Sequence, residues 1–112
     1  MVGTEMFRGG ATGGQLVCLV GPVQGQSFPL GQGVYLGRDA ARAQVVVQDS
    51  QVSGQHVWVG PLAGRIVARD PGSTNGTFLN DPASPRIGEA ELRPGDRLFL
   101  GPKGSVVFEY RP

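Results

Sequence analysis

The sequence predicts an all-β fold in which two sheets of short strands pack face to face. Apolar runs of three to six residues recur along the chain, and each is bounded by Gly, Pro, Asn or Asp. The 112 residues include 19 glycines and 9 prolines, an abundance typical of chains with many tight turns. No stretch carries the 3.6-residue apolar stripe of a helix of ordinary length.

The expected strands follow one another from Gln15 almost to the C-terminus. The clearest are QLVCLV (15–20), VYLG (34–37), AQVVVQ (43–48), HVWVG (56–60), RIVARD (65–70), TFLN (77–80), RLFLG (97–101) and SVVFEY (105–110). Alternation places Val57 and Val59 on one face of a strand and Trp58 on the other, as two packed sheets require. This spacing of runs and turns indicates a β-sandwich of about ten strands.

Length and composition indicate one globular domain. A chain of 112 residues can bury one core but is too short for two, and its 39% hydrophobic and 17% charged residues are typical of folded proteins. Residues 1–14 show little pattern and end in glycines, so we expect a flexible N-terminal tail followed by a domain over 15–112. We find no internal repeat.

Charge and cysteine content exclude several classes of protein. A net charge of +1 offers no broad basic surface for nucleic acid. The single cysteine, Cys18, cannot form an internal disulfide, and in LVCLV we expect it to be a small buried hydrophobe. No apolar run approaches a membrane span, and no signal-peptide core is present. We expect no cofactor, metal or membrane contact, and a cytoplasmic location.

Two loops between the expected strands carry candidate binding residues. In the first, Arg38 follows Gly37 at a strand end and presents a planar fork of donors that suits phosphate or carboxylate. In the second, Ser53 offers a hydroxyl, and His56 can brace the loop by bonding to backbone groups. Each residue alone is also compatible with an ordinary surface or structural role.

The third loop is the stretch DPGSTNG, residues 70–76. Ser73 and Thr74 supply hydroxyls, Asn75 both donates and accepts, and Gly76 is free of the restriction that a Cβ atom imposes. Asn-Gly alone is an ordinary hairpin signal. Because strands supply rigidity and loops supply reach, we expect the three loops to form one site at one end of the sandwich.

An enzyme of the Ser-His type is the competing interpretation of the second loop. It would use Ser53 as nucleophile and His56 as base, with Asp49 or Asp70 as the orienting acid. Ser and His so close on one loop seldom reach triad geometry, and the chain has no strained G-x-S-x-G elbow. We therefore predict a non-catalytic protein.

The three loops together carry a resemblance to a known family. Gly37-Arg38, Ser53-x-x-His56 and GSTNGTFLN (72–80), in this order and spacing, resemble the forkhead-associated (FHA) domain family. The match covers residues 15–110, and LRPGDRLFLG (92–101) is similar to a late strand of that family. The resemblance implies an FHA-type β-sandwich of about eleven short strands in two sheets, with phosphothreonine peptides bound by loops at one end.

The resemblance also implies residue roles. Arg38 and Ser53 would contact the phosphate, Thr74 would line the phosphothreonine pocket, and Asn75 would bond the peptide backbone. The residues expected to support the site are Gly37, His56, Gly76 and Asn80.

Several positions depart from the family pattern. Gly54 stands where members often carry Arg, Lys or Asn after the serine, so one side-chain contact is missing, although the Gly54 N–H can still reach the phosphate. Asp39, beside Arg38, is a candidate competitor for its guanidinium. Asp81 stands where a glycine often follows Asn80, so we expect that turn to differ.

The tail carries a further hypothesis. Thr4 lies three residues before Phe7, and FHA domains typically read the third residue after the phosphothreonine. If a kinase modified Thr4, the tail would fold back into its own pocket at high effective concentration. The alternative is that Thr4 belongs to an unmodified chain start.

The leading hypothesis is a phosphothreonine-reading monomer that recruits phosphorylated partners downstream of a Ser/Thr protein kinase. The alternative keeps the fold but binds partners through a sheet face, independently of phosphate. A scaffold of that kind has no need of Arg38, Ser53 and Thr74 together.

Overall fold

The computed structural model describes residues 14–112 and confirms the all-β prediction. The described part contains ten strands, one fewer than the resemblance implies. They are β1 (Gln15–Val20), β2 (Ser27–Pro29), β3 (Val34–Gly37), β4 (Val45–Val46), β5 (Val57–Leu62), β6 (Arg65–Arg69), β7 (Thr77–Leu79), β8 (Glu89–Glu91), β9 (Arg97–Leu100) and β10 (Val107–Arg111). The expected tail, including Thr4, lies almost wholly outside the described residues.

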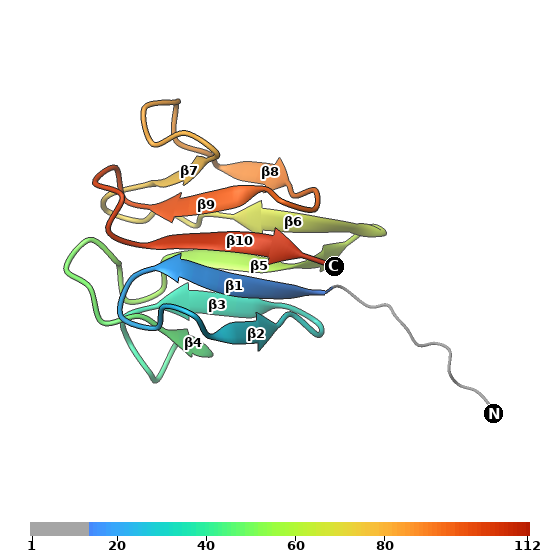
Figure 1. Ribbon diagram of the computed structural model, residues 1–112, viewed down its shortest axis with the longest axis horizontal. Helices are drawn as coiled ribbons and strands as arrows, with labels where there is room; N and C mark the ends of the chain where they lie inside the picture. The colour runs from blue at the N-terminus through green and yellow to red at the C-terminus, as the bar shows by residue number, and fades with distance from the viewer. Residues whose placement is uncertain (1–13) are drawn as a thin grey trace.

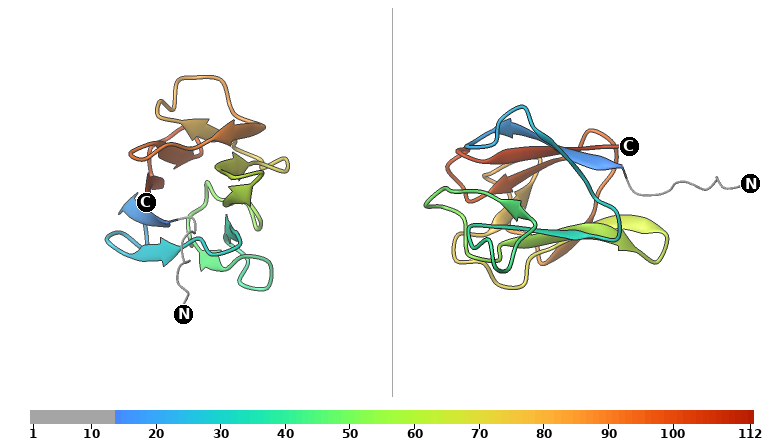
Figure 2. Two further views of the ribbon diagram at one scale, coloured as in Figure 1. Left: turned by 90° about the vertical axis from the view of Figure 1, so that its right-hand side faces the viewer. Right: turned by 90° about the horizontal axis from the view of Figure 1, so that it is seen from below.

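The strands form two five-stranded sheets. One has the order β2-β1-β10-β9-β7 and the other β4-β3-β5-β6-β8. Neighbours are antiparallel except β3 and β4, which pair in parallel. Figure 2 shows the two sheets as separate layers, and the buried residues of the core come from both of them.

The core is filled by the inward-facing residues of both sheets. Val57 and Val59 are fully buried while Trp58 between them is partly exposed, which confirms the predicted alternation. Phe108 on β10 is the largest fully buried side chain, and its ring packs against Phe28 with a centroid separation of 6.2 Å. Burial of this kind is the main term that stabilises a small sandwich.

Cys18 on β1 is buried, as predicted. Its thiol donates to the carbonyl oxygen of Val20, and burial raises the pKa of the thiol. A thiol with a raised pKa is a poor nucleophile at neutral pH, so Cys18 has the properties of a core residue.

The topology brings the three candidate loops to one end of the sandwich. β3 ends at Gly37, β5 begins at Val57 and β7 begins at Thr77, and the loops at these points lie together at the left of Figure 1. The start of β1 and the end of β10 lie at the opposite end, where Gln15 pairs with Arg111.

Residues 14–112 contain no helix that could cross a membrane.

Candidate functional site

The first two loops are held together by their backbones. The N–H groups of Arg38 and Asp39 donate to the carbonyl oxygens of Ser53 and Gly54, at 2.9 and 3.1 Å. The approach is so close at Gly37 that a Cβ atom there would collide with the Gly54 carbonyl group. Gly37 is therefore required by contact between the loops, which agrees with its predicted supporting position.

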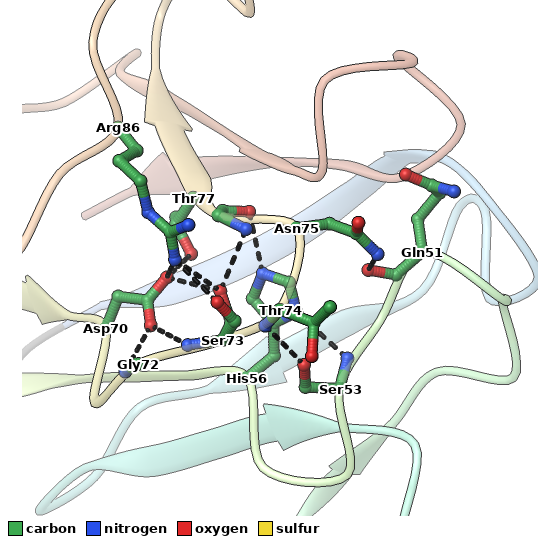
Figure 3. A network of polar contacts seen from close by, with 11 residues as sticks. Gln51, Ser53, His56, Asp70, Gly72, Ser73, Thr74, Asn75, Thr77 and Arg86 are labelled. Atoms are coloured by element: carbon green, nitrogen blue, oxygen red, sulfur yellow. Dashed lines mark hydrogen bonds and ion pairs between the residues drawn. The ribbon is translucent and has the colours of Figure 1, made fainter.

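His56 joins the second loop to the third. The side chain is fully buried, its Nδ1 accepts from the Ser53 N–H at 3.1 Å, and its Nε2 lies 2.9 Å from the Gly76 carbonyl oxygen (Figure 3). Because Nδ1 must accept, we assign the proton to Nε2, which then donates to Gly76. Burial lowers the pKa of His56 and outweighs the Gly76 carbonyl and the Asp70 carboxylate, which act to raise it.

This geometry does not support the nucleophile–base interpretation. Both ring nitrogens of His56 are bonded to backbone groups, and the Ser53 hydroxyl oxygen instead accepts a hydrogen bond from the Thr74 N–H at 3.0 Å. His56 thus holds the position of two loops, and it leaves the Ser53 hydroxyl proton available to another acceptor.

Asp70 organises the third loop from inside. One carboxylate oxygen accepts from the N–H groups of Gly72 and Ser73, and the other accepts from the hydroxyls of Ser73 and Thr77 at 2.6 and 2.8 Å (Figure 3). Burial raises the pKa of Asp70, but these hydrogen bonds outweigh it and lower the pKa below its ordinary value. Asp70 therefore remains a carboxylate that fixes the loop.

Ser73 turns away from the cavity that Thr74 lines. It is buried, donates its hydroxyl to Asp70, and accepts from the Gly76 N–H at 3.0 Å. The two hydroxyls of this loop therefore differ in purpose, since Thr74 is exposed at the cavity and Ser73 belongs to the interior. Gly76 has φ of 87°, a conformation that favours glycine and supports its predicted role in the turn.

Arg86 closes the outer side of the third loop. Its Nη2 donates to the Ser73 carbonyl oxygen at 2.6 Å and lies 3.8 Å from an Asp70 carboxylate oxygen. Arg86 follows β7 and has no local signal that points to Asp70, so sequence reasoning missed it. The role of Asp70, in contrast, is predictable from the sequence. An Asp in a Gly-rich and Ser-rich loop often accepts from the backbone N–H groups two and three residues further on, which is an Asx turn.

The three loops line an open cavity of about 280 Å³. It brings together the five residues that the sequence predicted for phosphopeptide binding, and it adds two that the prediction missed. The lining residues are Arg38, Ser50, Val52, Ser53, Gly54, Thr74 and Asn75. Their contact with a ligand stays a prediction. Asn75 also ties two loops together, since its Nδ2 donates to the Gln51 carbonyl oxygen at 3.1 Å.

Asn80 lies at the other end of β7 from the cavity. Its side chain accepts from the Arg97 N–H at 2.8 Å and donates to Asp96 at 3.0 Å, so it fastens the end of β7 to the start of β9. The residue has φ of 65°, which asparagine tolerates better than most side chains. After it, Asp81 closes its own turn by accepting from the Ala83 N–H at 2.8 Å.

Asp39 does not compete for Arg38. Its carboxylate pairs with Nε of Arg42 at 3.1 Å and accepts from the Ala41 N–H, so the expectation of an Asp39–Arg38 contact is wrong. Hydrogen bonds from the Ala41 N–H and from Arg42 lower the pKa of Asp39. Arg38 is exposed, and among residues 14–112 no carboxylate lies within ion-pair distance of its guanidinium.

Comparison with known proteins places this architecture in a family. A family model described as the cytoplasmic domain of the inner membrane component of T3SS, a domain with an FHA fold, matches residues 18–109. The chain belongs to the forkhead-associated (FHA) family. A curated FHA domain-containing protein of Arabidopsis thaliana is 29% identical over 98 residues, which cover 86% of this chain. The chain spans about a quarter of that relative, 25% of its length.

Solved FHA domains agree in fold over almost their whole length. FHA-1 of Rv1747 from Mycobacterium tuberculosis has a TM-score of 0.67 at 29% identity, covering 90% of this chain and all of its own. The FhaA FHA domain, solved in a complex with the intracellular domain of Rv3910, has a TM-score of 0.71 at 26% identity. That similarity covers 87% of this chain and 98% of the FhaA domain.

Proposed function

We propose that this FHA domain binds phosphothreonine-containing peptides and recruits their proteins without catalysing a reaction. The convergence of Arg38, Ser53 and Thr74 from three loops on one cavity carries the proposal. A phosphate has nearly two negative charges and three acceptor oxygens, so it is matched by a guanidinium, a hydroxyl and N–H groups that converge on one point. The FhaA relative, solved with an intracellular protein domain, supports recruitment as the outcome.

The hydrogen-bond pattern supports a separate role for each residue, with some groups assigned to the phosphate and others to the peptide backbone. The Ser53 hydroxyl accepts from the Thr74 N–H, so its own proton is directed to a phosphate oxygen. Arg38 supplies the charged fork, and the Gly54 N–H is a further donor at the cavity. Because Asn75 uses Nδ2 on Gln51, we assign its side-chain oxygen to an N–H of the peptide backbone.

Preference for phosphothreonine over phosphoserine depends on a single methyl group. Val52 lines the cavity but is only 1% exposed and belongs to the core, so we assign the contact with that methyl to the methyl group of Thr74, which is exposed at the cavity. A fitted methyl contributes about 1–3 kcal/mol to discrimination. We therefore expect phosphothreonine to bind more tightly than phosphoserine in the same peptide.

A titration of matched peptides tests the proposal. One peptide is prepared with threonine, phosphothreonine and phosphoserine at the same position, and each form is titrated by calorimetry. Loss of a charge-assisted hydrogen bond costs about 1.5–3 kcal/mol, so Arg38→Ala should weaken phosphothreonine binding by about 10- to 150-fold.

Arg65→Ala is the matched control. Arg65 is an exposed arginine that begins β6 at the end of the sandwich opposite the loops, so its loss removes the same charge far from the cavity. Binding that ignores the phosphate, or that survives in Arg38→Ala, would favour the phosphate-independent scaffold instead.

The cellular setting follows from this chemistry. A phosphothreonine reader acts downstream of a Ser/Thr protein kinase, and the cytoplasm is the compartment that we propose for both. We also propose that residues 15–112 are the folding unit and that the domain works as a monomer. Sedimentation of this fragment at two concentrations checks the oligomeric state, because a second species at the higher concentration would contradict the monomer.

The N-terminal hypothesis also remains a proposal, since Thr4 lies outside the described residues. Gly14 lies ten positions after Thr4, and ten residue steps in extended form span at most about 33–36 Å. The six residues of β1, which run from that end toward the loops, span only about 20 Å. The extended tail is longer than β1 but shorter than the 46 Å long axis of the molecule, so self-binding requires the tail to run nearly straight along the sandwich.

Phosphorylating Thr4 should lower the apparent affinity for an added phosphothreonine peptide. Protein carrying Thr4→Ala and treated with the same kinase is the control. An unchanged affinity after complete phosphorylation of Thr4 would contradict self-binding.

A further inference from the structure

The space above Gly54 is occupied by an arginine from a different loop. A Cβ atom at Gly54 would collide with Nη2 of Arg42 and would lie 3.4 Å from its Cζ and from Cβ of Asp39. The guanidinium therefore rests against bare backbone at a residue that lines the cavity. Gly54 has an ordinary φ, so the absence of a side chain there matters for space and not for backbone conformation.

Arg42 is held in this place from several sides. Its N–H donates to the Asp39 carbonyl oxygen at 2.9 Å, and its Nε donates to the Asp39 carboxylate at 3.1 Å. The Gln55 side chain donates to the Arg42 carbonyl oxygen at 3.1 Å, which fastens the turn to the second loop. The turn of residues 39–42 is thus docked on the loop that carries Ser53 and Gly54.

The ion pair with Asp39 leaves other N–H donors of the Arg42 guanidinium for a ligand. A guanidinium has five N–H donors, and Asp39 engages Nε while Nη2 faces Gly54. The Arg42 side chain is 58% exposed, so an approaching ligand can reach it without displacing packed residues. Asp39 in this arrangement is a positioning residue that orients the guanidinium.

We propose that Arg42 is a second arginine of the phosphopeptide site, which binds an anionic oxygen of the ligand at the rim of the cavity. The inference rests on the proposed phosphopeptide function. Gly54 lacks a side chain of its own, and its bare backbone lets the Arg42 guanidinium stand beside the cavity in its place. The anionic oxygen belongs either to the phosphate or to an acidic side chain next to the phosphothreonine, and the same donors suit both.

Two peptides separate these sources. Both contain phosphothreonine, one with neutral neighbours and one with Asp or Glu beside it, and each is titrated against wild type, Arg42→Gln and Arg65→Gln. We expect Arg42→Gln to weaken binding by about three- to tenfold and to reduce the salt dependence of the affinity. Arg65 is a close match, because its side chain is 59% exposed and also ion-paired.

The pattern of losses identifies the contact. Equal weakening of both peptides assigns Arg42 to the phosphate, while weakening of the acidic peptide alone assigns it to the neighbouring carboxylate. Either outcome supports the proposal. If Arg42→Gln behaves like Arg65→Gln with both peptides, the proposal is wrong.

Gly54→Ala tests the proposal independently, because it fills the space beside Gly54 without changing Arg42. The added methyl takes the volume that Nη2 occupies, so it should displace the guanidinium and reproduce most of the Arg42→Gln loss. Because both changes then act on one interaction, the double variant should bind no more weakly than Arg42→Gln alone. Losses that simply add would mean that the methyl obstructs the ligand directly, and they would overturn the part of the proposal in which the bare backbone of Gly54 makes room for Arg42.

The same titrations separate this inference from the proposed function. Wild type that binds neither phosphopeptide overturns the function itself. Wild type that binds both, and loses them in Arg38→Ala but not in Arg42→Gln, overturns only the role of Arg42.

Discussion

Nε2 of His56 lies 2.9 Å from the carbonyl oxygen of Gly76, twenty residues further along the chain. Together with the hydrogen bond from the Ser53 N–H to Nδ1, this contact allows one imidazole to link two loops of the site. A protonated ring would need to donate from both nitrogens, and Nδ1 already faces an N–H donor. His56 can therefore make both hydrogen bonds only when its imidazole is neutral.

Stability should fall as the pH falls below about 6.5. Above that value His56 is neutral in both the folded and the unfolded chain, and its full contribution is present. Below it the unfolded chain takes up a proton first, because burial lowers the pKa of His56 in the folded state below its ordinary 6.5. The free energy of unfolding should then decrease until the pH reaches the lower folded pKa.

Urea unfolding between pH 7.5 and pH 5 measures this effect. His56 is the sole histidine of the chain, so NMR titration of its ring protons reports the folded pKa without ambiguity. A folded pKa at or above 6.5, or an unfolding free energy that rises with acidity, would contradict the prediction. Binding is a poorer readout here, because the second phosphate ionisation itself falls near pH 6.

Replacing Ser53 or Ser73 by alanine should have different effects, on phosphopeptide affinity in the first case and on stability in the second. Ser53→Ala removes a proposed phosphate donor from a partly exposed position, so phosphopeptide affinity should fall by about tenfold with little change in unfolding free energy. Ser73→Ala removes a buried hydroxyl bonded to Asp70, so the free energy of unfolding should fall by about 1–3 kcal/mol. Urea unfolding and peptide titration of both variants check the pair, and equal destabilisation by the two changes would refute it.

Gly37→Ala should both destabilise the domain and weaken phosphopeptide binding. The new Cβ collides with the Gly54 carbonyl group and must push two loops of the site apart. Overpacking of this kind costs about 1–3 kcal/mol. Gly88→Ala is the control, because Gly88 also has an ordinary φ and nothing lies within 4 Å of its added methyl. Thermal unfolding and peptide titration should leave Gly88→Ala close to wild type.

Asp70→Asn should cost about 2–3 kcal/mol of stability while nearly preserving side-chain shape. Asparagine presents an NH₂ group where the carboxylate now accepts donors on both of its oxygens. Since the folded pKa of Asp70 is lowered, its contribution is present above about pH 3.8 and is lost as the pH falls through the folded value. Urea unfolding at pH 7 compares it with the exposed Glu89→Gln, which should be nearly neutral.

The strands and the loop motifs of this protein could be predicted from the sequence, because both depend on residues that are close together along the chain. Strand alternation at Val57 and Val59 is a period-two pattern, and it was correct because both residues face one core. Arg38 and Thr74 each stand in a short motif next to a strand end, so their gathering at one cavity was predictable once the sandwich was.

Contacts through space were out of reach of the same reasoning. Arg86 bonds to Ser73 across thirteen residues, and Arg42 covers Gly54 from another loop. No period or motif relates these pairs, because their proximity is a product of sheet topology. The error at Asp39 has a different and local cause: the expected partner was its sequence neighbour Arg38, whereas the turn brings its carboxylate to Arg42, three residues further along the chain.

The pairing of Gln15 with Arg111 has a mechanical consequence. β1 begins and β10 ends at the same end of the sandwich, on adjacent antiparallel strands. A pull applied at these two points loads the ladder at its last hydrogen bond, and the bonds then break one after another, as a zipper opens. Tension along the chain would therefore detach β1 at low force, while the same strands sheared lengthwise would resist with all their bonds together.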